Sequence, residues 1–210
     1  MHSPLAGPTC PRSTQNIILA RHGESEYSAR GLCNGDVTIP VALTERGRDE
    51  ARRLGAALRD TPLELCVTSE FLRARETADI ALTGRGLPRL VVPELNDPLV
   101  GRYEGAGIED YRAWAASSHS AALPGPGGES RLSIVGRYAR AFRILLARPE
   151  AVILVVCHSL PIAYAMEARA GRTPAVRAPM AEHATAYPFT AEELAAAADL
   201  LETWAAHPTW

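Results

Sequence analysis

The stretch Asn-Ile-Ile-Leu-Ala-Arg-His-Gly, residues 16–23, gives the first indication of how this chain is built. Its first five residues form a short, mostly apolar run, which is typical of a strand buried on both faces of a sheet. A cation and an imidazole, Arg21 and His22, follow this run directly. Gly23 then allows the backbone to approach a ligand closely. The stretch therefore predicts a buried strand that ends in polar groups suited to chemistry.

Similar apolar runs recur along the chain, and helical patterns separate them. The further predicted strands are residues 63–68, 90–92 and 151–157. The predicted helices are residues 43–58, 71–82, 130–148, 160–170 and 191–204, and the expected caps of the first, second and last are Thr44, Ser69 and the Thr190–Glu193 capping box. Strands that alternate with helices favour an α/β fold, a three-layer sandwich in which helices cover both faces of a mostly parallel sheet.

Length and composition are typical of one globular domain. The 210 residues suffice for a single sizeable core. We expect residues 16–210 to form this domain, and residues 1–15, which hold three prolines and no signal-peptide core, to form a flexible tail. No apolar run approaches the roughly 20 residues that a membrane-spanning helix needs. The Gly-, Pro- and Ser-rich residues 101–128 are predicted to make a long excursion over one face.

Charge and cysteine usage exclude several classes of protein. A net charge of −2 gives no global field that would attract nucleic acid or an anionic membrane, so we expect neither partner. All 22 basic residues are arginines, which excludes Schiff-base chemistry on lysine and leaves guanidinium forks, imidazoles and backbone amides to bind anions. The four scattered cysteines (Cys10, Cys33, Cys66 and Cys157) indicate neither a disulfide framework nor a zinc site. We therefore expect a cytoplasmic protein without a metal or other cofactor.

Polar groups follow three of the predicted strands. Arg21 and His22 follow the first, Arg73 comes shortly after the strand at 63–68, and His158 follows the strand at 151–157. Because ligands of such sheets bind at the carboxyl ends of the strands, we expect these four side chains to converge. Two imidazoles and two guanidiniums around one cavity would neutralise a phosphoryl dianion. Taken singly, each could be a structural core histidine or a surface arginine, so the prediction depends on their convergence.

Five motifs occur in order along the chain. They are residues 16–35, beginning N-I-I-L-A-R-H-G-E-S, residues 68–78 (T-S-E-F-L-R-A-R-E-T-A), residues 95–105 (L-N-D-P-L-V-G-R-Y-E-G), residues 127–130 (G-G-E-S) and residues 157–159 (C-H-S). Together they resemble the histidine phosphatase superfamily, in its phosphoglycerate-mutase-like branch. The resemblance implies that His22 is the nucleophile and carries the phosphoryl group as phosphohistidine. It also implies that Arg21, Arg73 and His158 bind the phosphoryl oxygens.

The same resemblance implies the rest of the site. The positions that match substrate-binding residues of the family are Asn34, Gly35, Ser28 and Ser159. Ser28 stands where the family usually has Asn, which shortens that contact. The general acid is usually a Glu four residues before a glycine, and counting back from Gly101 gives Asp97, with Glu94 as the second candidate.

These residues predict a phosphomonoester hydrolase that acts on a small phosphorylated metabolite. A cofactor-dependent phosphoglycerate mutase is the first alternative. It is disfavoured because residues 106–126 are few and hold one cation, Arg112, to bind a second phosphate. An inactive module that kept the phosphate pocket is the second alternative. A homodimer stays open.

Substrate specificity is expected to reside in residues 102–128 and 171–189. Tyr103, Tyr111 and Trp114 could pack on a substrate, but we favour the reading in which these rings anchor the loop to the core. His183 could reach the site or lie on the surface, and we expect the surface position.

Overall fold

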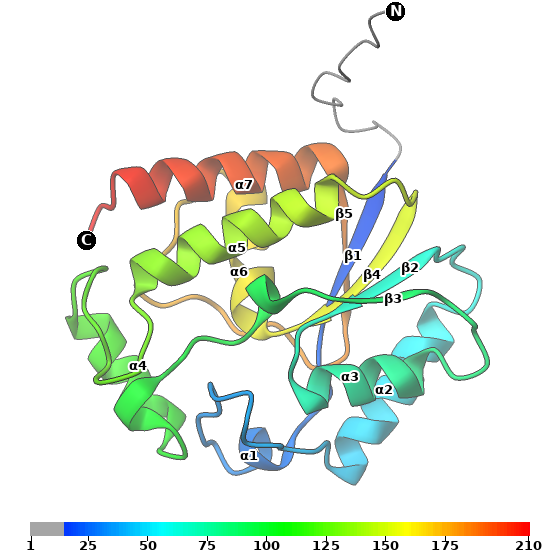
Figure 1. Ribbon diagram of the computed structural model, residues 1–210, viewed down its shortest axis with the longest axis horizontal. Coiled ribbons are helices and arrows are strands. Elements are labelled where there is room, and N and C mark those ends of the chain that lie inside the picture. Colours follow the sequence, from blue (N-terminus) through cyan, green and yellow to red (C-terminus); the bar gives the residue numbers. More distant parts are fainter. Residues whose placement is uncertain (1–14) are drawn as a thin grey trace, which may run out of the picture.

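The computed structural model describes residues 15–210, which form a five-stranded sheet between two layers of helices (Figure 1). The strands are β1 (Asn16–Arg21), β2 (Leu65–Thr68), β3 (Arg89–Val91), β4 (Val152–Cys157) and β5 (Ala186–Thr190). Their order across the sheet is β3-β2-β4-β1-β5. The first four run parallel, and β5 runs antiparallel to β1. The predicted three-layer α/β sandwich is confirmed.

Alternate residues of β1 face opposite helical layers. Ile17 and Leu19 pack in a core with α5 (Arg131–Leu146), α6 (Ser159–Arg169) and α7 (Ala191–Ala206). Ile18 and Ala20 pack in a second core with α2 (Glu45–Ala57) and α3 (Leu72–Ala81). A strand whose side chains are buried on both faces must be apolar throughout, which explains the continuous run at 16–20. These five helices are the five that the sequence predicts.

Two of the three predicted helix caps are confirmed, and one is wrong. Thr44 caps α2, and Thr190 with Glu193 forms the capping box of α7. Ser130, the first residue of the predicted helix 130–148, caps α5. Helix α3 begins at Leu72 with Phe71 in the cap position. The Ser69 hydroxyl, expected to cap α3, instead lies 2.9 Å from Nε2 of His158.

The sequence analysis did not predict β5. Pro188 lies inside this strand and cannot donate a hydrogen bond to a neighbour. A proline is tolerated because β5 is an edge strand, paired with β1 alone in this sheet. Because a proline normally argues against a strand, Pro188 explains why β5 was not predicted.

The excursion over one face is anchored by aromatic packing. It contains the short η2 (Gly101–Tyr103) and a helix that was not predicted, α4 (Ile108–Ser117). The rings of Tyr103, Tyr111 and Trp114 form a cluster with centroid separations of 5.7 to 5.9 Å, packed on buried Cys33. These rings therefore fix α4 to the body of the protein, as favoured from the sequence.

The predicted tail, residues 1–15, lies outside the described residues except for Gln15. Contrary to the expectation of a flexible residue, the Gln15 side chain is buried. Its amide donates hydrogen bonds to the carbonyl oxygens of Arg148 at 3.0 Å and Glu150 at 3.1 Å. Gln15 thus ties the start of β1 to the loop before β4.

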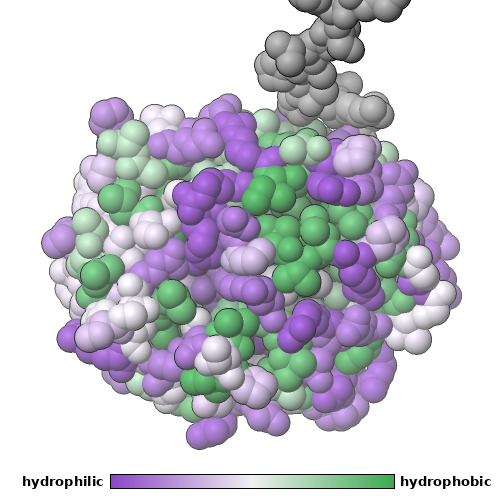
Figure 2. Space-filling model, viewed as in Figure 1, coloured by the Kyte–Doolittle hydropathy of each residue, from purple (hydrophilic) through white to green (hydrophobic). Residues whose placement is uncertain are grey.

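The surface is largely polar, with an apolar patch at the free edge of the sheet. Figure 2 shows hydrophobic side chains gathered on this face between α5 and β3, and Val91 at the end of β3 is 45% exposed. Another chain could cover such a patch. The homodimer stays a prediction. Of the helices in the described part of the chain, none combines the length and apolarity needed to cross a membrane.

Close contact between α2 and α3 yields a stability prediction. A Cβ at Gly55 would come within 2.3 Å of the carbonyl oxygen of Ala81, whereas a Cβ at Gly136 in α5 would meet the Arg140 side chain at 3.7 Å. We expect Gly55→Ala to lower the free energy of unfolding by about 1–3 kcal/mol through overpacking. Gly136→Ala should raise it by up to about 1 kcal/mol through helix propensity. Urea unfolding measures both, and a stabilising Gly55→Ala would contradict the helix contact.

Candidate active site

The carboxyl ends of β1 and β4 place two histidines side by side. The two strands are parallel neighbours, and Arg21 pairs in register with Cys157. His22 and His158 are the next residues, so they leave the sheet at the same level. Their ring centroids lie 5.3 Å apart in an edge-on arrangement. The convergence predicted from the strand ends is therefore present.

The hydrogen bonds of His22 fix its tautomer. Nδ1 lies 2.7 Å from the carbonyl oxygen of Gly23 and donates to it, while Nε2 accepts from the Arg73 Nε–H at 3.1 Å. Burial, followed by the positive charge of Arg73 and its neighbours, holds the pKa of His22 well below its ordinary value. The imidazole is therefore neutral at pH 7 and carries a lone pair on Nε2, as a nucleophile requires.

Arg73 lies at the centre of the phosphate cup, the name used here for the group formed by Arg21, His22, Arg73 and His158. Its side chain is 3% exposed. Besides the bond to His22, it donates to the side-chain and main-chain oxygens of Asn34, to Asp97 at 3.0 Å and to Nδ1 of His158 at 3.3 Å. The guanidinium also stacks over the Phe71 ring at 4.1 Å from its centroid. This set of partners holds one planar cation beside both histidines.

His158 is fully buried and is oriented from two sides. Its Nε2 lies 2.9 Å from the Ser69 hydroxyl, and its Nδ1 faces Asp97 at 3.4 Å. Burial and the guanidiniums of Arg73 and Arg21 hold the pKa of His158 well below its ordinary value. A second neutral imidazole therefore lies directly beside that of His22.

Asp97, and not Glu94, reaches the site. The Asp97 carboxyl is 31% exposed and lines the cavity. Withdrawal from bulk water raises its pKa, and the nearby charges of Arg73 and Arg21 oppose this rise. Glu94 lies in η1 (Pro93–Leu95) and is not a lining residue of the cavity. Its carbonyl oxygen accepts a hydrogen bond from Arg137 at 2.8 Å.

Arg21 completes the cationic wall. Its Nη1 donates to the carbonyl oxygen of Ala181 at 2.9 Å. Its Nε is buried and has no hydrogen-bond partner within residues 15–210. Burial lowers the pKa of Arg21 to about 10, so the side chain stays charged at pH 7. Gly23 serves close packing next to it, because a Cβ there would come within 2.4 Å of the Gly47 carbonyl oxygen.

The four expected substrate-binding residues behave differently. Asn34, Ser28 and Ser159 line the cavity. The Ser28 hydroxyl already takes part in the capping box of α1 (Glu26–Ala29). The Ser159 hydroxyl accepts from the backbone N–H of Ala181 at 2.8 Å.

Gly35 is not brought into the cavity. Its N–H donates to Glu104 at 2.7 Å, and a Cβ there would come within 2.1 Å of the Pro98 carbonyl oxygen. Glu104 also accepts from the N–H of Asp36 at 3.0 Å and from the Asn34 amide at 3.2 Å. Glu104 belongs to the motif at residues 95–105, but its role was not predicted from the sequence. It holds the loop that carries Asn34.

His183 lies beside His22, so the surface position favoured from the sequence is wrong. Its ring lies 5.7 Å from that of His22, with Nδ1 3.9 Å from Glu50. Its Nε2 is buried without a hydrogen-bond partner in the described part of the chain. The neighbouring Ala184 has a φ of 44°, a left-handed conformation that turns the chain at this point. The sequence of residues 171–185 shows no periodic pattern from which the position of His183 beside His22 could be predicted.

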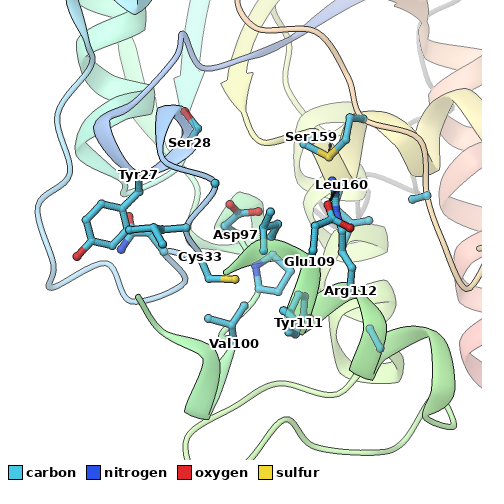
Figure 3. A pocket seen from close by; sticks show the side chains of 18 of the residues that line it. Tyr27, Ser28, Cys33, Asp97, Val100, Glu109, Tyr111, Arg112, Ser159 and Leu160 are labelled. Atoms are coloured by element: carbon cyan, nitrogen blue, oxygen red, sulfur yellow. Dashed lines mark hydrogen bonds and ion pairs between the residues drawn. The ribbon is translucent and has the colours of Figure 1, made fainter. Parts of the chain in front are cut away.

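The cup opens into a cavity of about 460 Å³. Figure 3 shows Asp97 between residues of the α1 region, such as Tyr27 and Ser28, and residues of α6, Ser159 and Leu160, while α4 contributes Tyr111 and Arg112. Across residues 15–210, no group of three or more His, Cys, Asp or Glu side chains is placed to hold a metal ion. The arrangement suits a phosphate group in the cup and the body of a small molecule beyond it.

Comparisons with known proteins agree with this geometry. The family model of the histidine phosphatase superfamily (branch 1) matches residues 17–187. The chain is 37% identical to the adenosylcobalamin/alpha-ribazole phosphatase of Salmonella typhimurium over 113 residues, 50% of this chain and 55% of that protein. It is 35% identical to the 2,3-bisphosphoglycerate-dependent phosphoglycerate mutase of Methylobacterium sp. over 132 residues, 58% of this chain and 62% of that protein.

A solved structure shares the fold. The crystal structure of a putative alpha-ribazole-5'-P phosphatase from Escherichia coli superimposes with a TM-score of 0.72 at 28% identity, covering 83% of this chain and 89% of that one. The matches to the first curated relatives span only about half of their length.

The buried position of His183 gives a pH prediction. Burial lowers its pKa to about 4 in the folded protein. Between about pH 6.5 and 4, His183 therefore binds a proton in the unfolded chain but not in the folded protein. His183 therefore reduces stability as the pH falls from 6.5 towards 4. We expect His183→Asn to make the pH dependence of the unfolding free energy shallower in this window, by up to about 1.4 kcal/mol per pH unit. Urea unfolding between pH 7 and 4.5 measures the slopes, and identical slopes would place His183 in solvent.

Proposed function

Because the chain belongs to the histidine phosphatase superfamily (branch 1), we propose that it is a phosphomonoester hydrolase in which His22 carries the phosphoryl group as phosphohistidine. One observation carries the proposal. A neutral imidazole, with its lone pair on Nε2, and a buried guanidinium line one cavity, and a second histidine lies beside them. Such a site offers a nucleophile and fixed positive charge where phosphoryl transfer needs them.

In the first step, Nε2 of His22 attacks phosphorus in line and the ester P–O bond breaks. Arg21 and Arg73 bind the phosphoryl oxygens and stabilise their charge, and His158 holds the Arg73 guanidinium in place. The Arg73 Nε–H, which donates to Nε2 in this structure, exchanges that bond for one to a phosphoryl oxygen. Asp97, protonated at this point, gives its proton to the leaving oxygen. The raised pKa of Asp97 supports this role.

In the second step, a water molecule attacks phosphorus and the P–N bond breaks. The Asp97 carboxylate accepts the proton of this water, so the acid of the first step becomes the base of the second. Inorganic phosphate leaves, and His22 is neutral again. Asp97 thus gives one proton and takes one back over the cycle. The arginines supply the positive charge that the phosphoryl oxygens need.

The relatives support a small phosphorylated substrate. Those matched first are named adenosylcobalamin/alpha-ribazole phosphatases. Phosphoglycerate mutases are also among the relatives, and they favour phosphotransfer as the second candidate. A mutase must return the phosphoryl group before water reaches it, whereas Asp97 here is partly exposed to the open cavity. We therefore place hydrolysis first, and comparing phosphate release with phosphoglycerate isomerisation separates the two.

We also propose a cytoplasmic location. Cys33, Cys66 and Cys157 are buried and unpaired, as in a reducing compartment. Burial raises the pKa of Cys66 to about 11, so its thiol is inert at pH 7.

The nucleophile gives the first test. We expect His22→Ala to lower kcat for p-nitrophenyl phosphate by at least about 10³-fold, since the covalent route is removed. The variant should also lose the acid-labile, base-stable label that a phosphodonor leaves on the wild type. His119→Ala is the matched control, because His119 is exposed on the surface. Near-normal turnover of His22→Ala would overturn the assignment. A wild type that neither turns over nor takes the label would indicate a phosphate-binding module.

The acid gives the second test. We expect Asp97→Asn to lower kcat/KM for an alkyl phosphate by roughly 10²–10⁴-fold. The loss for p-nitrophenyl phosphate should be much smaller, because that leaving group needs no proton. As the pH rises through the raised pKa of Asp97, the wild type loses its acid, so the alkaline fall in alkyl phosphate hydrolysis should vanish in the variant.

Glu94→Gln is the matched control for this second test. It should keep both the rate and the pH profile of the wild type, since Glu94 does not line the cavity. A loss with Glu94→Gln and none with Asp97→Asn would reverse the assignment of the acid.

A further inference from the structure

The cavity beyond the cup is rich in positive charge. Among the described residues that line it, the charged side chains are Arg21, Arg73, Arg112, Arg131, Arg177, Asp97 and Glu109. Asp97 pairs with Arg73 at 3.0 Å, and Glu109 pairs with Arg112 at 2.6 Å. Neither carboxylate is left for the other arginines. Arg21 belongs to the phosphate cup, so the charges of Arg131 and Arg177 need another explanation.

Arg131 is a largely buried cation without a counter-ion. Within residues 15–210, no carboxylate lies within 4.0 Å of its guanidinium. Its Nη1 donates to the Tyr164 hydroxyl at 2.9 Å, and the group lies 5.8 Å from the Trp210 ring centroid. One phenol oxygen satisfies only one of its five N–H donors. In the part of the chain that the structure describes, none of the other Arg131 nitrogens is a buried atom without a partner, so the remaining donors are accessible from the cavity.

Arg137, on the same helix, shows what full compensation looks like. Its Nη2 and Nε donate to the two carboxylate oxygens of Glu129 at 2.6 and 2.9 Å. It also donates to two backbone carbonyls, those of Glu94 and Asn96. Arg137 is not a lining residue of the cavity, whereas Arg131 is. Of these two arginines, the one without an anionic partner is therefore the one that faces the cavity.

Arg131 shares the cavity with the acid without belonging to the cup. Arg131, Tyr111 and Asp97 all line this cavity, and the charges of Arg131 and Asp97 both act on Tyr111. None of the hydrogen bonds of His22, Arg73 or His158 within the described residues involves Arg131. A substrate whose phosphoryl group sits in the cup can therefore extend along Tyr111 and present a second group to Arg131.

We propose that Arg131 forms a second anion-binding subsite, which binds a carboxylate or a second phosphate on the substrate whose phosphoryl group occupies the cup. The inference rests on the proposed function and narrows its substrate class to phosphate esters with a second anionic group. The free guanidinium nitrogens can donate to two oxygens of one anion at once. Apolar residues such as Val100 and Leu160 also line the cavity and suit a short hydrocarbon body. Arg177 is exposed at the cavity and adds positive charge.

A matched series of substrates tests the subsite. Phosphate esters of ω-hydroxy acids with two to six carbons are compared with alkyl phosphates of equal length. Alkanediol bisphosphates form a third arm that distinguishes a phosphate from a carboxylate. For at least one length, the wild type should show a kcat/KM at least about 10-fold higher for the anionic ester, since a hydrogen bond to a charged group is worth about 1.5–3 kcal/mol. Equal values across all lengths would overturn the subsite.

Variants of Arg131 show whether this side chain causes the preference. We expect Arg131→Met to lower kcat/KM for the preferred anionic ester by about 10–100-fold. Hydrolysis of the alkyl phosphate should remain unchanged, and Arg131→Lys should restore part of the preference. Arg140→Met, an exposed position on the same helix, is the matched control. Equal losses on both kinds of ester would show that Arg131 has only a structural role.

A binding measurement separates the failure of this inference from failure of the proposed function. Non-hydrolysable ω-carboxyalkyl phosphonates and alkyl phosphonates are titrated calorimetrically against the wild type and Arg131→Met. Tighter binding of the carboxylated ligand, lost in the variant, supports the subsite even if no ester is hydrolysed. Equal affinity of both ligands overturns the subsite, while phosphate release that depends on His22 would leave the hydrolase assignment standing.

Discussion

The site depends on a single buried guanidinium, that of Arg73. A cation removed from water must find acceptors for its donors, and Arg73 finds them on His22, Asn34, Asp97 and His158. These acceptors come from three motifs that lie far apart in the sequence, at residues 16–35, 95–105 and 157–159. Satisfying one charge therefore fixes the relative positions of the expected nucleophile, second imidazole and acid. The same contacts that stabilise the folded site also give it its geometry.

The sequence was sufficient to predict those parts of the molecule that follow from local pattern. Strands buried on both faces must be apolar throughout, and the ends of parallel neighbours meet at one edge of the sheet. This reasoning found β1, β2 and β4 and placed His22, Arg73 and His158 together. Asp97 came from the resemblance to a family, because a loop residue after a short 3₁₀ helix carries no periodic signal.

Other parts depend on tertiary contacts that no local pattern encodes. Strand β5 contains Pro188 and exists because β1 offers it an edge. His183 reaches the ring of His22 because the chain turns at Ala184, whose φ of 44° is unusual for a residue with a side chain. Gly35 matched a ligand-binding position, but its N–H is taken by Glu104. Whether a backbone donor is free for a ligand or used within the fold cannot be known before its neighbours are placed.

The same buried environment shifts the pKa values of the proposed nucleophile, His22, and the proposed acid, Asp97, in opposite directions. Poor solvation disfavours any charged form, so it lowers the pKa of His22 and raises that of Asp97. The base is thereby kept neutral and the acid is biased towards its protonated form. The ion pair with Arg73 works against the second effect, since it favours the Asp97 carboxylate. A phosphoryl dianion in the cup accepts the hydrogen bonds of Arg73 and adds negative charge nearby, and both changes raise the pKa of Asp97 further. Substrate binding itself would thus deliver the proton donor, because substrate and acid compete for the same guanidinium.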